Sequence, residues 1–277
     1  TGAISRNVIT SRTNSGIRNR RRTQASHSIP IRSTQGAISV ISEDDSKIQS
    51  LAIGASVAIS SGATAVSVSI SASIARNEIN SDVTAMISDA DVSSHLDTVV
   101  RAGKEPEADG SRPANRSISA ISVAASVSLA SGSSQEVSLA GAGAESSNVI
   151  LGDTTASVVD SNLLSDAGIQ LQANDKSAIS ATVVAASIGA GSIGASVSDN
   201  SIGYDSDGER IGNKIEASSL NSTMNAVGAL EVDAESSATI TANVIAASIA
   251  VAKGSGTALS GSGSGVSTTN RVAQDVK

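Results

Sequence analysis

The sequence predicts an all-β protein, specifically a β-solenoid (β-helix-like fold) built from about four repeats of roughly 61–70 residues each. Three observations favour this class: a segment that recurs at a fixed spacing, an alternation of β-branched and small residues, and a near absence of aromatic side chains. Successive side chains of a strand point to opposite faces, so alternation is typical of strands with one buried face.

The recurring segment sets the length of the repeat. Residues 123–127 recur at 184–188 and, after an equal interval, at 245–249. An earlier copy at 53–57 precedes them by a longer interval. Internal repeats of this kind are typical of stacked architectures. The longer first interval predicts an insertion, which we place in the polar stretch 102–115.

A second marker, Asn-x-Ile or Asn-x-Val, follows the same repeat. In the third full copy it comes early, and we expect the acidic loop 205–214 to restore the length. Residues 1–42 are then a basic N-terminal partial repeat, and residues 43–277 are the repeat array. The marker asparagines are Asn7, Asn77, Asn148, Asn200 and Asn270.

The alternation also predicts which side chains face inward. Val184, Ala186 and Ile188 are expected in the core, and Ala185 and Ser187 on a flat opposite face. Glycine-containing breaks are expected to be turns. Whether one unit forms one wide rung or two narrow ones stays open, as does a series of antiparallel hairpins. The breaks lie at 61–62, 131–132, 189–191 and 253–256.

Composition narrows the function. The 277 residues include no Cys, Trp or Phe, and Tyr204 is the one aromatic residue, so a thin core of Ile, Val, Leu and Ala is expected. Without Cys, disulfide frameworks and cysteine zinc sites are excluded. No apolar run approaches the roughly 18 residues of a membrane span. Because the chain begins at Thr1, we expect it to be a segment of something longer.

The search for catalytic motifs finds none, whether G-x-S-x-G, H-E-x-x-H or a P-loop. His95 lies near Asp91 and Asp97, but among 55 serines a chance Ser/His/Asp combination is expected, and a solvated loop histidine is the favoured interpretation. With His27 the only other histidine, a His-rich metal site is not expected. We therefore expect no enzyme, no catalytic residue and no cofactor.

Two acidic segments are candidate cation sites. Residues 205–209, DSDGE, offer oxygen ligands of the kind that calcium prefers, but the third acidic ligand and the bidentate Glu of an EF-hand loop are missing. A solvated acidic turn is the favoured interpretation, and residues 43–45, EDD, are interpreted in the same way. We therefore expect no metal site.

Basic residues concentrate in the N-terminal part. Residues 1–42 carry a net charge of +7 and the remainder −14. The run Arg18–Arg22 could be a solvated edge, or it could pair with a neighbouring layer, since aligning Asn7 with Asn77 puts it over residues 88–92. Binding of nucleic acid or glycan is the third possibility, although aromatic residues for base stacking are absent and the acidic remainder of the chain would repel phosphate.

The repeat pattern A-x-S-A-I-x-A…A-A-S-I…G…N-x-I…T-A-x-I/V-x-D-S resembles the repeats of very large bacterial secreted proteins. These are the leukotoxin-type filamentous adhesins and related autotransporter-like surface proteins. The resemblance covers most of residues 37–277. It implies secretion, repetition and surface contact, and supplies no catalytic residues. The matching stretches are Ser177–Ile188, Asn148–Ser161 and Ser67–Asp89.

The expected function is a structural and adhesive rod or filament segment, extracellular or at the cell surface, that self-associates end to end. Its expected partners are other copies and host or matrix glycans, with no nucleic acid and no membrane span. The alternatives are a solenoid that binds glycan, polyanion or ice and, ranked behind it, a polysaccharide-acting β-helix enzyme. Such enzymes generally use aromatic residues and clustered carboxylates, which this sequence does not offer.

Overall fold

The computed structural model describes residues 1–19, 30–105, 107, 113–251 and 260–277. Every regular element among these residues is a strand. All pairings between these strands are parallel. The predicted all-β class is therefore confirmed, and the alternative of antiparallel hairpins is wrong for this part of the chain.

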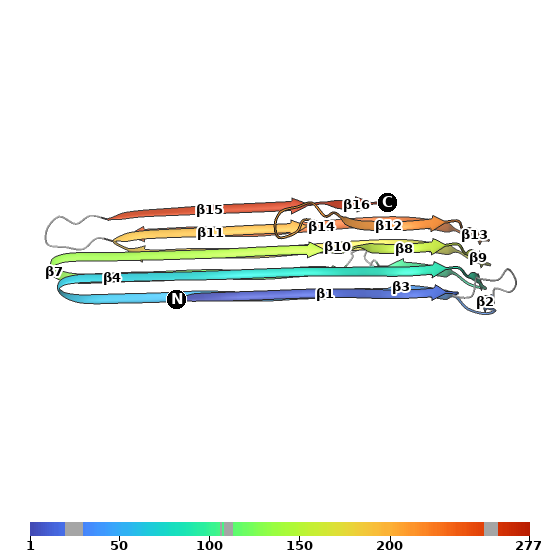
Figure 1. The fold of residues 1–277 in the computed structure, drawn as a ribbon, viewed down its shortest axis with the longest axis horizontal. Helices are drawn as coiled ribbons and strands as arrows, with labels where there is room; N and C mark the ends of the chain where they lie inside the picture. Colours follow the sequence, from blue (N-terminus) through green and yellow to red (C-terminus); the bar gives the residue numbers. More distant parts are fainter. Residues whose placement is uncertain (20–29, 106, 108–112, 252–259) are drawn as a thin grey trace.

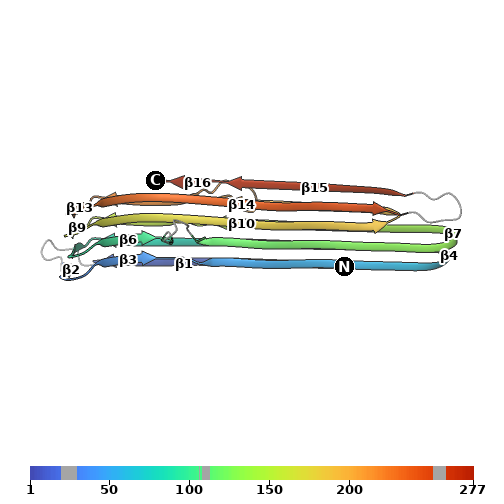
Figure 2. The same cartoon turned by 180° about the vertical axis from the view of Figure 1, so that it is seen from behind.

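The chain runs to and fro along one long axis and builds two leaves, which Figures 1 and 2 show from opposite sides. The first leaf comprises residues 38–62, 98–132, 169–189 and 230–250. Neighbouring layers of this leaf are joined by parallel ladders. Its strands are β3 (Ile38–Ser42), the first part of β4 (Ser46–Ser88), β6 (Thr98–Ala102), the first part of β7 (Arg116–Leu151), β10 (Ile169–Gly189) and β14 (Leu230–Ala250).

The second leaf comprises residues 2–18, 64–88, 135–159, 191–220 and 261–276, which makes five layers. The long strands β4 and β7 pass from the first leaf into the second at one end of the molecule, called here the reversal end (Figure 1). The remaining strands of this leaf are β1 (Gly2–Arg18), β8 (Thr154–Val159), β11 (Gly191–Ile202), β12 (Asn213–Leu220), β15 (Gly261–Val272) and β16 (Gln274–Val276).

A separate four-stranded parallel sheet joins the leaves at the other end, called here the corner end. Three of its strands follow a bend whose residue has positive φ: Asp89 at 54°, Asp160 at 47° and Asn221 at 49°. Asp and Asn tolerate this left-handed conformation better than other non-glycine residues, which explains why they recur at the bend. The strands are β2 (Ile31–Ser33), β5 (Asp91–Ser94), β9 (Asn162–Ser165) and β13 (Thr223–Ala226).

The register follows the spacing of the recurring segment. Val184 pairs with Val123 on one side and with Ile245 on the other, its equivalents in the two neighbouring copies. Ser42 pairs with Ala102, an offset of 60 in residue number, whereas Ser46 pairs with Arg116, an offset of 70. The additional length of the longer copy thus lies between Ala102 and Arg116, as predicted.

The acidic loop restores the length of the third full copy, as predicted. Ile150 pairs with Ile202, an offset of 52 in residue number, whereas Thr154 pairs with Ile215, an offset of 61. The additional length therefore lies between β11 and β12. The same layer reverses direction tightly at Ala190, between β10 and β11. The predicted turn at 253–256 lies outside the described residues.

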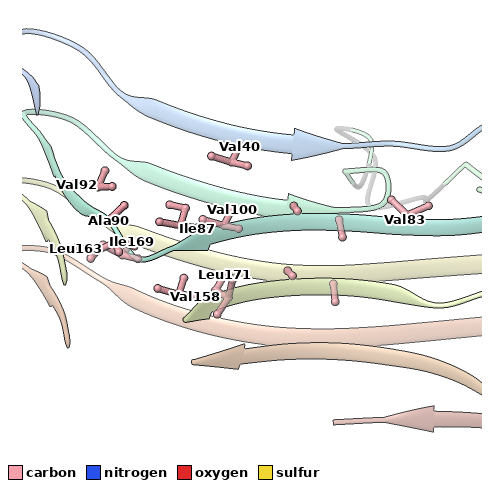
Figure 3. Packing of buried hydrophobic residues seen from close by; sticks show 14 of the residues in the cluster. Val40, Val83, Ile87, Ala90, Val92, Val100, Val158, Leu163, Ile169 and Leu171 are labelled. Carbon is pink, nitrogen blue, oxygen red and sulfur yellow. The ribbon is translucent and has the colours of Figure 1, made fainter. Parts of the chain in front are cut away.

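The interior changes in composition along the strands. A large aliphatic cluster fills the corner end (Figure 3). Next along the strands comes a cluster dominated by isoleucines from both leaves. Toward the reversal end the buried cluster contains four alanines and a valine. Its members are Ala124, Ala142, Ala144, Val183 and Ala185.

The predicted facing of the recurring segment is wrong. Ala185 and Ser187 are buried, whereas Val184 and Ile188 lie on the outer side of the first leaf and are partly exposed. The same holds in the first layer, where Ile53 is 56% exposed. In the recurring segment, small residues therefore fill the space between the leaves, and the aliphatic side chains face outward.

Candidate functional site

An asparagine ladder runs through all five layers of the second leaf. Each of the first four marker asparagines donates from Nδ2 to Oδ1 of the next marker asparagine, over 2.8 or 2.9 Å. Asn77 and Asn148 are buried, so water cannot replace these bonds there. The sequence marks these positions by their spacing, and the ladder explains why the amide recurs. The bonded series is Asn7, Asn77, Asn148, Asn200 and Asn270.

A buried ion pair lies between the two leaves. The Nη1 atom of Arg116 is 3.0 Å from Oδ1 of Asp175, and both side chains are 0% exposed. Arg116 also donates from Nη2 to Oγ1 of Thr154 in the second leaf over 3.0 Å. Asp175 accepts from the Ser177 hydroxyl at 3.0 Å and from Nε2 of Gln274 at 3.3 Å. This network joins both leaves and three layers.

Burial raises the pKa of Asp175, and the positive charge of Arg116 opposes that rise only in part. The negative charge of Asp44 raises the pKa further. The repulsion between these two carboxylates thus adds to the cost of burying Asp175. Spacing along the chain could not indicate the network, because its members do not stand at equivalent positions of the repeat: Arg116 pairs in register with Ser177 and not with Asp175.

The prediction of a solvated turn at residues 43–45 is wrong for Asp44, which is 8% exposed. Glu43 accepts from Nη2 of Arg101 at 3.3 Å. Asp45 is exposed but accepts from Nζ of Lys104 at 2.8 Å, and this hydrogen bond lowers the pKa of Asp45. The acidic segment thus binds basic side chains of the next layer.

The DSDGE loop uses its first carboxylate on its own backbone. Oδ1 of Asp205 accepts from the amides of Asp207 and Glu209, at 3.0 and 2.8 Å. The Arg271 guanidinium lies over the Tyr204 ring, 5.6 Å from its centroid, and is 3.1 Å from both carboxylate oxygens of Asp199. Within the described ranges, no three His, Cys, Asp or Glu residues gather as a metal ion would require.

The histidine that the sequence places near Asp91 and Asp97 contacts a different acid. Nδ1 of His95 is 3.0 Å from Oδ2 of Asp166 in the next layer, and both side chains are exposed. Asp97 instead accepts from the backbone amide of Gly168 at 2.7 Å. These contacts join layers at the corner end. His27 lies outside the described residues.

Arginines of the second leaf also contact neighbouring layers. Arg12 lies 3.3 Å from Asp82, and Arg76 lies 3.2 Å from Glu145. Arg18 pairs with Ser88 in register and donates from Nε to its hydroxyl over 3.2 Å, as the alignment of Asn7 with Asn77 predicts. Arg20 to Arg22 lie outside the described residues, so the interpretations of the basic run stay untested.

The leaves approach each other closely toward the reversal end. A Cβ atom on Gly54 would lie 2.4 Å from the carbonyl oxygen of Ala72 in the opposite leaf, so only glycine fits there. Serine hydroxyls cross the same gap: Ser73 donates to the carbonyl of Ala52 over 2.7 Å, and Ser196 to that of Ile245 over 2.6 Å. The flat face that the sequence predicts is thus buried between the two leaves.

What remains accessible is a pair of outer faces. On the first leaf, aliphatic columns such as Val57 at 69% exposure flank a column of alanines. The part of the chain that the structure describes has no helix long and apolar enough to cross a membrane. Comparisons with protein-family models, with curated proteins and with solved structures found no match to this chain.

Proposed function

We propose that this chain is a β-solenoid segment of about four repeats. In this proposal it serves as a structural and adhesive, non-catalytic rod or filament element of a secreted or cell-surface bacterial protein, and associates end to end with other copies. The observation that carries the proposal is the asparagine ladder. It links five layers in one register along one axis, and the same bond can be repeated when a further layer is added.

The end strands support association along the same axis. Among the described residues, β1 pairs only with β4, and β14 pairs only with β10. Edge strands with unpaired backbone groups can accept a further strand from another chain. The basic N-terminal part and the acidic remainder favour head-to-tail over head-to-head contact.

The ladder has a direction that agrees with head-to-tail contact. Every step donates from the asparagine of the lower residue number to that of the higher one. A ladder that continues from one copy into the next therefore requires Asn270 of one copy to meet Asn7 of its neighbour. Two copies that meet head to head would place the same ladder group of each copy, such as the Oδ1 acceptor of Asn7, against its counterpart.

The test is sedimentation velocity together with electron microscopy from low to high salt. We expect particles longer than one chain, which shorten as salt screens the charges, with a Debye length of about 10 Å at 0.1 M. An Arg6→Ser/Arg12→Ser variant in β1 should associate less, whereas Arg76→Ser in an inner layer should behave as wild type. Particles of single length at every salt concentration would contradict the proposal.

The ligand-binding alternatives have their own tests. A glycan array and a thermal-hysteresis assay address glycan and ice binding, and neither depends on end-to-end association. The outward columns of the recurring segment consist of aliphatic residues and alanine, and not of the ranked threonines usual for ice binding. The structural and adhesive function is therefore the one that we propose.

A further inference from the structure

The outer side of the first leaf carries a regular apolar surface, which we call the outer aliphatic face. It is formed by the outward side chains of residues 51–59, 121–129, 182–188 and 243–251, which are apolar except for Thr182 and Asn243 at one edge. Two columns of β-branched residues flank one column of alanines, and in-register pairing keeps each column straight. The columns are Ile53, Val123, Val184 and Ile245; Ala55, Ala125, Ala186 and Ala247; and Val57, Val127, Ile188 and Ile249.

These side chains are in water in the isolated chain. Val57 is 69% exposed and Ile249 is 54% exposed, on opposite edges of the face. The corresponding side chains of the two inner layers are partly buried. A column of alanines between two aliphatic columns leaves a furrow that can receive a ridge of another apolar surface.

The face contains no charge. None of the residues 49–59, 119–129, 180–188 and 241–251 is acidic or basic. The outer side of the second leaf differs, because Arg76 and Glu145 lie on it and glycines such as Gly143 and Gly265 interrupt its columns. A charged partner would therefore find no counter-charge on the outer aliphatic face, whereas an identical apolar face fits it.

The size of the face also suits a second copy. A strand segment as long as 51–59 spans roughly 30 Å and four layers roughly 19 Å, so the face covers on the order of 600 Å². Apart from Thr182 and Asn243 this area is apolar, so it falls within the range of the largest apolar patch on typical monomers, about 300–600 Å². Two such faces together would bury about 1,200 Å², which reaches the lower limit of a specific protein interface.

From these observations we propose that two copies of this chain pair through their outer aliphatic faces, first leaf against first leaf. The contact joins molecules side by side, so it goes beyond end-to-end association and does not depend on it. Sheets packed face to face lie about 10 Å apart, with side chains interleaved between them. The alanine furrow provides the space for this interleaving.

The test compares two glutamates at alanines on opposite outer faces. In sedimentation equilibrium we expect the wild-type chain to shift from monomer to dimer with concentration. Ala125→Glu should raise the dissociation constant at least tenfold, because a dimer would bury the new charge. Ala195→Glu is the matched control, since Ala195 lies exposed on the outer side of the second leaf, and it should dimerise as wild type.

A second variant guards against misfolding. Val57→Thr/Ile249→Thr keeps the β-branched shape and places two hydroxyls in the face, so it should fold, as circular dichroism can verify, and still dimerise more weakly. A wild-type chain that stays monomeric at every concentration, or an Ala195→Glu effect as large as that of Ala125→Glu, would overturn the proposal.

Salt and particle shape separate this contact from end-to-end association. Face pairing should double the width of particles in electron micrographs, leave their length unchanged and persist at high salt, because apolar burial is not weakened by charge screening. Particles that lengthen but never widen would support end-to-end association and reject face pairing. Particles that widen but never lengthen would do the reverse.

Discussion

The guanidinium of Arg116 lies 3.0 Å from the carboxylate of Asp175, and neither side chain is exposed to solvent. The two residues belong to consecutive layers of the first leaf, where Arg116 pairs with Ser177. Burial of a charged pair costs desolvation energy, which the mutual attraction of the charges offsets only in part. The pair therefore makes the stability of this stack depend on pH.

The first prediction concerns that dependence. The folded-state pKa of Asp175 is raised above its ordinary value of 3.8, so the folded chain binds a proton more tightly than the unfolded chain. Between these two pKa values stability falls as pH rises. Relative to Asp175→Asn, which does not titrate, the wild type should therefore gain stability as pH is lowered from 7 toward 4. Urea unfolding of both proteins across this range measures the difference, and an unchanged difference would contradict the prediction.

The second prediction concerns the facing of neighbouring residues. Ala185→Asp places an unpaired charge in the small-residue interior and should destabilise the protein by at least about 3 kcal/mol. Val184 lies on the partly exposed outer side of the first leaf, so Val184→Asp should cost less than about 1 kcal/mol in the monomeric chain. Denaturant unfolding of the two variants measures both costs. Equal costs would mean that both sides of the first leaf are covered.

The third prediction concerns the asparagine ladder. Asn148→Ala leaves Nδ2 of Asn77 and Oδ1 of Asn200 without partners, at about 1–3 kcal/mol for each buried group. Asn7→Ala, at the half-buried end of the ladder, leaves only one ladder group, Oδ1 of Asn77, without its partner and should therefore cost less. Thermal or urea unfolding provides the comparison. If the ladder does not contribute to stability, both substitutions will change the free energy of unfolding by equal, small amounts.

The fourth prediction concerns two glycines of the second leaf. Gly203 has a φ of 77°, and a Cβ atom there would lie 1.9 Å from the carbonyl oxygen of Ala273. Gly203→Ala should thus cost more than the roughly 1–2 kcal/mol of left-handed strain alone. A Cβ atom on Gly263 meets nothing within 4 Å, so Gly263→Ala should be neutral or stabilise by up to about 1 kcal/mol. Similar unfolding midpoints for the two variants would refute this contrast.

Much of the architecture could be predicted from spacing. The intervals between copies of the recurring segment indicated which strands pair, and composition indicated where the layers differ in length. In-register stacking places each residue beside its equivalent in the next copy. The repeat spacing in the sequence therefore predicts the register between the strands. That is why Val123, Val184 and Ile245 lie side by side.

The facing could not be predicted, because alternation defines two faces without saying which one is inside. The usual rule puts aliphatic side chains in the core. Toward the reversal end the gap between the leaves is too narrow for them, and serine hydroxyls bridge it instead. One signal was available: Gly54, Ala124, Ala185 and Ala246 form a column of uniformly small residues, which is typical of a close backbone approach.

The change of interior along the strands has a thermal consequence. Heat capacity rises when apolar surface is exposed on unfolding and falls when polar surface is exposed. The corner end buries valine, leucine and isoleucine, whereas the reversal end buries alanine and serine hydroxyls. Cooling weakens hydrophobic stabilisation, so the corner end should lose more of its stability in the cold than the hydrogen-bonded reversal end. A single polypeptide thus contains two regions whose stability curves differ in shape.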